Sequence, residues 1–404
     1  MDHAEIGQRI AQARRRRGMS QAVLAGLVGR SESWLSQVER GKRGVDSHVV
    51  LTRLTAALRI DIAQGTGEPA AADSTVRPYP NVPEIEQAMI SYEGLRVPVS
   101  GKDGRRPPSL SHLQEMARSA HRDYQATRYN STGMALPRLI RATEAASRAA
   151  GPATRAVCEI RALVYDIATA LLNRIGEPGL AWVAADRAMS AAECSDDPVL
   201  AAAGACRLSY VLTSRKNQRQ ALEVAMAAAD ALEPAIRSHN PEQLSVYGGL
   251  HLAAALAAAA DHDHARASSS LRSAREIADR LGTDKNLMRT AFGPVNVKIH
   301  AMSVSLHFGD ARTACEIGES LDTASLPDGL VGRRTQLHLD LARAYAMRRQ
   351  DAAAVNTLLA AERMSPELVR YDNRTRDVLM QLMRREHRPS TPELRPLAVR
   401  AGLA

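Results

Sequence analysis

SQAVLAGLVGRSESWLSQVERGKR, residues 20–43, is the stretch that decides the fold of the amino-terminal part of this chain. Two short amphipathic segments flank Gly29, and the second ends in Glu-Arg-Gly. Ser20 and Ser31 each precede a segment, and a serine hydroxyl there can accept a free backbone amide at the start of a helix. Gly29 suits a turn in which φ is positive. The stretch therefore predicts two helices joined by a tight turn.

The neighbouring residues extend this pair to a helical domain over residues 1–65. A first helix is expected over about residues 4–17, with a break at Gly18, and a closing helix over about 47–58. Apolar residues recur at helical spacing and predict the core, which comprises Ile6, Ile10, Ala13, Ala22, Leu24, Ala25, Val28, Leu35, Val38, Val50, Leu51, Leu54 and Leu58. The domain is also basic, because residues 1–65 contain eleven Arg/Lys and six Asp/Glu, a net +5 of the chain's +9. Such charge suits a polyanionic partner, with a solvated basic face as the simpler alternative.

The order of small, apolar and polar residues resembles the Cro/C1-type (XRE) helix-turn-helix family over about residues 5–62. The matching pieces are Gly7-x-Arg9-Ile10, Ser20-Gln21-x-x-Leu24-Ala25, Gly29-x-Ser31, Leu35-Ser36-x-Val38-Glu39-Arg40-Gly41 and Leu54-x-x-Ala57-Leu58. The chain departs from the family at Arg30, where a small hydrophobic residue is common. The resemblance implies a five-helix-type domain that binds double-stranded DNA and regulates transcription. A helix-turn-helix that binds only protein is the alternative.

The resemblance also implies which residues meet DNA. The helix that begins after Ser31 would lie in the major groove, with its outward side chains facing base edges. Gln37 can hydrogen-bond adenine and Glu32 can accept from cytosine N4, whereas basic side chains bind phosphates. The expected DNA-binding set is Gln21, Arg30, Ser31, Glu32, Ser33, Ser36, Gln37, Arg40, Lys42 and Arg43, with Arg9 and Arg14 as further phosphate contacts. Glu39 is expected to pair with Arg9 or Arg14, and Trp34 to pack partly against the core or a sugar edge.

Residues 66–110 interrupt the helical pattern. They contain seven prolines, which remove helix donors and restrict the preceding residue: Pro69, Pro78, Pro80, Pro83, Pro98, Pro107 and Pro108. One short helix is expected at about residues 84–91, because Ile85, Ala88 and Met89 share a face. We interpret this region as a linker.

Residues 111–388 carry helical periodicity almost throughout. The chain is 45% hydrophobic but only 3% aromatic, which favours closely packed helices. Similar second helices are expected to begin near Gly179, Arg219, His264, Ala311 and Asp351, about 40–47 residues apart, as in a solenoid of helix pairs. Residues 341–366 resemble a tetratricopeptide repeat, with small Ala342, Ala354 and Ala361 at close approaches. The alternative is an irregular bundle. The predicted class is all-α, with a helix-turn-helix domain, an α-solenoid of such helix pairs and a frayed tail at 389–404.

The whole chain resembles actinobacterial regulators that join an XRE domain to tetratricopeptide-like helices. The supporting segments are residues 163–187, 292–300 and 340–366. This resemblance implies a module for sensing or dimerisation, and a homodimer also fits paired DNA half-sites. A solenoid's concave surface suits a peptide or small-molecule effector. Candidate ligand contacts are Arg128, Asn130, Arg138, Tyr165, Asn173, Tyr210, Asn296 and His300, although an exposed asparagine is usually only solvated.

The sequence offers little support for catalysis. Nucleophile–base spacings, zinc-ligand spacings, a P-loop and a dinucleotide-binding glycine pattern are absent, so no enzyme activity, metal or cofactor is expected. Asp261-His262-Asp263-His264 is interpreted as a polar turn between helices. A protein-interaction adaptor, in which the repeats recruit a partner, is the alternative function.

The remaining features favour a cytoplasmic protein without a membrane segment. The start of the chain is polar and then basic, and the longest apolar run, Leu252–Ala260, is shorter than the roughly 20 residues of a membrane span. Cys158, Cys194, Cys206 and Cys315 lie in apolar helical contexts without a CxxC pair. We expect four buried free thiols.

Overall fold

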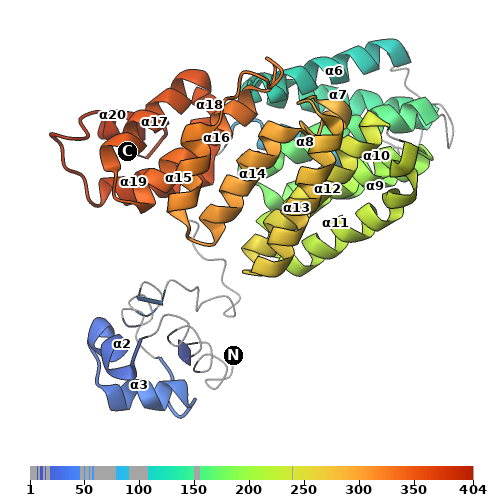
Figure 1. Ribbon diagram of the computed structural model, residues 1–404. Coiled ribbons are helices and arrows are strands. Elements are labelled where there is room, and N and C mark those ends of the chain that lie inside the picture. The colour runs from blue at the N-terminus through green and yellow to red at the C-terminus, as the bar shows by residue number, and fades with distance from the viewer. Residues whose placement is uncertain are drawn as a thin grey trace, which may run out of the picture. The chain divides into compact units, whose positions relative to one another are not determined.

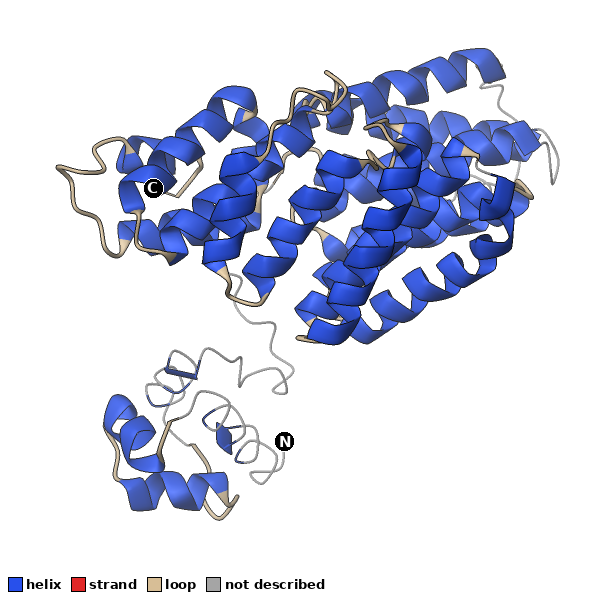
Figure 2. Ribbon diagram, viewed as in Figure 1, coloured by secondary structure: helices blue, strands red, loops and turns tan. Residues whose placement is uncertain are grey.

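The computed structural model describes residues 7, 10, 11, 14, 19–45, 50, 54, 57, 58, 79–90, 108–149, 155–238 and 240–403. Throughout these residues the regular structure is helical, without a β-strand, which confirms the all-α class (Figure 2). The chain divides into two compact units, Met1–Val76 and Arg77–Ala404 (Figure 1).

The first unit contains the predicted helix pair, α2 (Gln21–Val28) and α3 (Glu32–Glu39). The Ser20 side chain accepts a hydrogen bond from the Val23 amide, and Ser31 accepts one from the Trp34 amide. Gly29 has φ 71°, the left-handed conformation that the turn was expected to need. Both caps and the glycine turn are therefore confirmed.

The core of the first unit is formed by apolar residues from α2, α3 and the flanking segments. Its buried members are Ile10, Leu24, Ala25, Val28, Leu35, Val38, Val50, Leu54 and Leu58. Ala22 was expected inside but is exposed, because it lies on the outer face of the first turn of α2. The expected core positions Ile6, Ala13 and Leu51 lie outside the described residues, as do Arg9 and Gly18.

The second unit is an array of helices that follow one another as antiparallel neighbours (Figure 1). In chain order they are α5 (Val82–Ile90), α6 (Leu110–Gln125), α7 (Tyr129–Ala149), α8 (Arg155–Arg174), α9 (Pro178–Cys194), α10 (Pro198–Ser214), α11 (Gln218–Leu232), η2 (Glu233–Ser238), α12 (Pro241–Ala260), α13 (His264–Leu281), η3 (Leu287–Arg289), α14 (Pro294–His307), α15 (Ala311–Ser320), α16 (Val331–Met347), α17 (Asp351–Met364), α18 (Pro366–Tyr371), α19 (Asn373–Met383) and α20 (Leu394–Arg400). The predicted second helices are α9, α11, α13, α15 and α17, and each begins within one residue of its expected start. The first helices of the pairs, α8, α10, α12, α14 and α16, pack against one another in succession.

Two segments of the array, the Asp261–His264 stretch and the carboxy-terminal tail, test predictions made from the sequence. The Asp261–His264 stretch is a turn, in which Asp263 caps α13 through the Arg266 amide, as predicted. The tail is not frayed: α20 buries Leu394 and Leu397, and the Arg400 guanidinium binds both Glu362 carboxylate oxygens at 2.7 Å. Pro396 misled the prediction, because a proline in the first turn of a helix displaces no intrahelical donor.

The cysteine prediction was half wrong. Cys158 on α8 and Cys194 at the end of α9 form a disulfide, which joins the two helices of one pair. Cys206 and Cys315 are free and buried, as expected.

The segment that we interpreted as a linker contains α5, which buries Ile85, Ala88 and Met89 against the array. The Tyr79 hydroxyl, just before α5, donates a hydrogen bond to the Tyr129 carbonyl.

Of the described helices, α12 is long and apolar enough to cross a membrane by length and composition, but it is 78% buried within the array.

We expect Gly248→Ala to destabilise the second unit. A Cβ at Gly248 on α12 would lie 2.0 Å from Cζ of Phe292, a fully buried ring that cannot move without disturbing its neighbours. The cost should be about 1–3 kcal/mol in the free energy of unfolding, measured by urea denaturation. Gly249→Ala is the matched control, because its Cβ would meet Thr290 at an ordinary 3.5 Å. Equal unfolding midpoints for the two variants would contradict this packing.

Candidate functional site

The outer face of α3 carries a continuous set of polar side chains. Glu32, Ser33, Gln37 and Arg40 are exposed and Ser36 is half-buried, whereas Leu35 and Val38 on the opposite face are buried. The helical period therefore separates the predicted base-reading residues from the core. Their contact with DNA stays a prediction.

A buried carboxylate fixes the position of α3. Glu39 Oε1 accepts from Arg14 Nε at 2.6 Å, and Oε2 accepts from Arg14 Nη2 at 2.9 Å and from Gln21 Nε2 at 2.7 Å. Arg14 also donates to the Met19 carbonyl at 2.8 Å. The hydrogen bonds that Arg14 donates to Glu39 raise the pKa of Arg14. Of the two arginines expected to pair with Glu39, Arg14 does so, and the carboxylate joins α3 to the start of α2 and to the segment before it.

The remaining predicted DNA contacts lie around this framework. Gln21 uses one amide proton on Glu39, so a phosphate contact would use the other. Arg40 folds back and donates to the Ser36 carbonyl at 3.2 Å and to its hydroxyl. Lys42 and Arg43 are exposed just beyond α3. Trp34 is half-buried against the core, and the Arg30 guanidinium lies 5.7 Å from its ring centroid.

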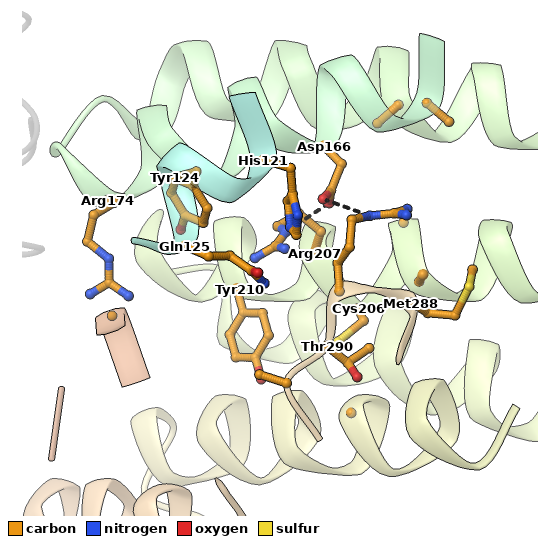
Figure 3. A pocket seen from close by; sticks show the side chains of 18 of the residues that line it. His121, Tyr124, Gln125, Asp166, Arg174, Cys206, Arg207, Tyr210, Met288 and Thr290 are labelled. Carbon is orange, nitrogen blue, oxygen red and sulfur yellow. Dashed lines mark hydrogen bonds and ion pairs between the residues drawn. The ribbon is translucent and has the colours of Figure 1, made fainter. Parts of the chain in front are cut away.

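The second unit contains a cavity of about 90 Å³, here called the inner cavity (Figure 3). The first helices α8, α10, α12 and α16 form its wall, and α6 and the loop at residues 287–291 close it. Charged and aromatic side chains line it, namely His121, Tyr124, Tyr129, Asp166, Arg174, Arg207, Tyr210, Arg289 and Arg333. A wider outer cavity of about 640 Å³ adjoins it and shares His121, Gln125, Leu200, Met288 and Arg289.

Positive charge predominates in the inner cavity. Asp166 lies between two arginines, with Oδ1 accepting from Arg207 Nε at 2.9 Å and Oδ2 at 3.8 Å from Arg289 Nε (Figure 3). Arg174 Nη1 lies 3.5 Å from Asp372 Oδ1. Across the described residues, Arg333 has no carboxylate within ion-pair distance and no side-chain hydrogen bond. Four guanidinium groups and the Asp166 carboxylate thus line the cavity, and Asp372, which lies outside the lining, pairs with Arg174.

The loop that closes the cavity is strained. Met288, Arg289 and Ala291 have φ of 45°, 63° and 53°, values that side chains disfavour. Asn286 holds the loop by donating to Gln125 Oε1 at 2.7 Å and accepting from the Ala291 amide at 3.2 Å. Arg289 Nε is buried without a hydrogen bond. Strain of this kind persists only where surrounding contacts enforce it, and it is concentrated at functional sites.

The arginines of the cavity shift the pKa values of Asp166 and His121. Burial alone would raise the pKa of Asp166, but Arg207 and Arg289 outweigh it and hold the pKa below its usual value. Burial lowers the pKa of His121 to about 4, and Arg289 and Arg207 add to that effect although Asp166 opposes it. His121 is therefore neutral at pH 7.

Three of the predicted ligand contacts lie together. Tyr210 lines the inner cavity, its hydroxyl is 3.2 Å from His300 Nε2, and His300 Nδ1 is 2.9 Å from the Asn296 carbonyl. Because a carbonyl only accepts, His300 Nδ1 carries the proton and the Tyr210 hydroxyl donates to Nε2. His300 and Asn296 are buried behind Tyr210.

The other predicted ligand contacts lie elsewhere in the array. Arg128, Asn130 and Arg138 are exposed, Asn173 is half-buried, and buried Tyr165 donates to Glu144 Oε1 at 2.8 Å. Sequence reasoning missed the cavity arginines and Asp166. The one available signal was Asp166 itself, a lone charge in the apolar run Leu163–Leu172.

One buried and two half-buried histidines should make the second unit acid-sensitive. Burial lowers the pKa of His121 to about 4, of His300 to about 3 and of His307 to about 4. The unfolded chain binds protons at about pH 6.5, so this stability is complete above that pH and is lost as pH falls towards 4. We expect a loss of about 2 kcal/mol per histidine between pH 7.5 and 5.0.

Urea unfolding followed by Trp182 fluorescence in a Trp34→Phe background measures this loss. His307→Gln should reduce the pH dependence, whereas His387→Gln, at an exposed position, should leave it unchanged. Identical midpoints at the two pH values in the parent protein would contradict the expectation.

Comparison with known proteins identifies the amino-terminal unit. The model of a helix-turn-helix domain family matches residues 5–64. This unit carries a helix-turn-helix domain. No curated protein matches the chain. Among solved structures, Bacillus thuringiensis PlcR in complex with the peptide PapR7 and DNA is similar at 12% identity, with a TM-score of 0.38, over 87% of this chain and 99% of that one.

Proposed function

We propose that this chain is a cytoplasmic, homodimeric transcriptional regulator of the XRE type, which binds specific DNA sequences through α3. The observation that carries the proposal is the exposed polar face of α3 within a helix-turn-helix domain, positioned by the buried Arg14–Glu39 pair. Ser33 and Gln37 on that face are exposed, and both residue types can hydrogen-bond base edges. A dimer is part of the proposal because one helix reads only a few base pairs, and two-fold proteins read paired half-sites.

The helical array serves, in this proposal, as the effector-binding part of the regulator, as the resemblance to actinobacterial proteins implies. It supplies a concave cavity on which charged groups converge, and small ligands bind at concave sites of this kind. A peptide or small-molecule effector would change DNA affinity only by binding one conformation of the protein better than another. The chain acts by binding and not by catalysis.

Binding to duplex DNA from the protein's own promoter region tests the proposal. Affinity should fall steeply with salt, as phosphate contacts require. Gln37→Ala should weaken specific binding by about 1–3 kcal/mol, roughly 5- to 150-fold, with little effect on random DNA. Gln220→Ala, an exposed glutamine in the array, is the matched control. Equal specific binding by wild type and Gln37→Ala would count against α3 as the reading helix.

A further inference from the structure

Among the residues that the structure describes, Arg333 of the inner cavity has no carboxylate partner. Arg333 makes no ion pair or side-chain hydrogen bond with the residues that the structure describes, although burial lowers its pKa. Arg333 is half-buried, and a charge that has lost part of its hydration without gaining a partner is destabilising. Arg289 is incompletely paired as well, because its Nε is buried without a hydrogen bond and lies 3.8 Å from Asp166 Oδ2.

The balance of charge indicates what is missing. Arg174, Arg207, Arg289 and Arg333 line the cavity with four positive charges, and His121 is neutral at pH 7. Two carboxylates pair with these arginines, namely Asp166 in the lining and Asp372, which lies outside it against Arg174. The residual charge of two is that of a dianion. Guanidinium forks bind carboxylate and phosphate oxygens in a bidentate manner, so several converging arginines are suited to an oxyanion.

We propose that the inner cavity binds the dianionic head group of a small ligand, a phosphate or a dicarboxylate, between Arg207, Arg289 and Arg333. This names the effector class of the array, and so it rests on the proposed function. The cavity of about 90 Å³ has room for such a head group, because a single water needs only about 10–15 Å³ on this scale. The body of the ligand lies in the outer cavity of about 640 Å³, which shares His121, Gln125 and Arg289 with the inner one.

The strained loop holds Arg289 in the cavity although its guanidinium is incompletely paired. Asn286 on Gln125 and Ser245 on the Thr290 hydroxyl, both at 2.7 Å, hold residues 286–290 against α6 and α12. These contacts fix the backbone of Arg289 with its guanidinium beside Asp166. The arginines are therefore positioned before the ligand arrives, which lowers the entropy cost of binding.

Isothermal titration of the full chain with inorganic phosphate, succinate and acetate, at pH 7.5 and constant ionic strength, tests this site. One equivalent of a dianion should bind per chain, at least tenfold more tightly than acetate. Tighter binding of phosphate assigns a phosphate head group, and tighter binding of succinate assigns a dicarboxylate. Failure of both dianions to bind overturns the proposal.

Variants locate the binding. Arg333→Gln should weaken dianion binding at least tenfold, Arg333→Lys should restore part of it, and Arg272→Gln, at an exposed position on α13, should leave it unchanged. Without ligand, Arg333→Gln should melt at the same or a higher temperature than wild type, because an unpaired, half-buried charge is removed. Wild-type affinity in Arg333→Gln overturns the site. If that variant fails to fold, the comparison of dianions with acetate and the Arg333→Lys variant decide.

DNA affinity is measured on the same ligand-free samples. If the protein binds dianions but not DNA, the dianion site stands and the proposed regulatory function is overturned. A protein that binds DNA but no dianion overturns only the site.

Discussion

Glu39→Ala is expected to unfold the amino-terminal unit and abolish DNA binding, while the helical array keeps its stability. The Glu39 carboxylate accepts three hydrogen bonds, two from Arg14 and one from Gln21. Both members of the Arg14–Glu39 pair are buried, so removing the carboxylate leaves a buried guanidinium without a counter-charge. Breaking a buried pair in this way costs about 3–5 kcal/mol, which is comparable to the whole stability of a domain of this size.

The two tryptophans of the chain separate the two units in this experiment. Trp34 packs on the core of the first unit and Trp182 lies on α9. Urea unfolding of Glu39→Ala in a Trp182→Phe background should show the Trp34 transition at much lower urea than in the parent protein. In a Trp34→Phe background, the Trp182 transition should not move. Glu32→Ala, an exposed glutamate on α3, is the control, and an equal shift in that variant would contradict a special role for Glu39.

The double variant Lys42→Glu/Arg43→Glu is expected to lose about 100-fold or more in DNA affinity without loss of stability. Both side chains are exposed immediately after α3, where they would meet phosphates beside the major groove. Each phosphate contact contributes about 0.9 to the slope of log affinity against log salt, so two contacts contribute nearly 2 per protomer. The glutamates add repulsion to that loss.

Fluorescence anisotropy across a range of salt concentrations measures both affinity and slope. The slope should fall together with the affinity, and the preference for specific over random DNA should change little, because phosphate contacts carry no sequence information. Arg138→Glu/Arg141→Glu, a charge-matched change in the array, controls for net charge. A full-strength slope in the Lys42/Arg43 variant would show that other cations bind the backbone.

Local chemistry predicted most of the helices. Ser20 and Ser31 cap the two helices with their hydroxyls, and Gly29 takes the left-handed conformation at the turn between them. The helical period of α3 places Leu35 and Val38 on the face opposite the polar residues. The helix starts in the array were predictable because Pro, Asp or Gly lies at the turns between helices. Pro396 shows the limit of that reasoning, since only its place in the first turn of α20 decides whether it breaks the helix.

The inner cavity was not predictable from spacing. Asp166 is on α8, Arg207 on α10, Arg289 in the loop after α13 and Arg333 on α16, and only the stacking of distant helices brings them together. The same holds for Cys158 and Cys194, which are 36 residues apart on adjacent helices. Tyr210 was predicted as a ligand contact because it lies near the candidate asparagines in the helical pattern, whereas none of the four cavity arginines was singled out.

The central claim is that α3 reads DNA sequence, and selection of bound fragments from random duplex DNA tests it most directly. The full chain should enrich a motif with two related half-sites about one helical turn apart. Gln37→Ala should relax the preference at one position in each half-site while Lys42→Glu/Arg43→Glu keeps the motif at reduced yield. Two results would contradict the account: the wild type enriches no motif, or Gln37→Ala enriches the same motif as the wild type with unchanged preference at every position.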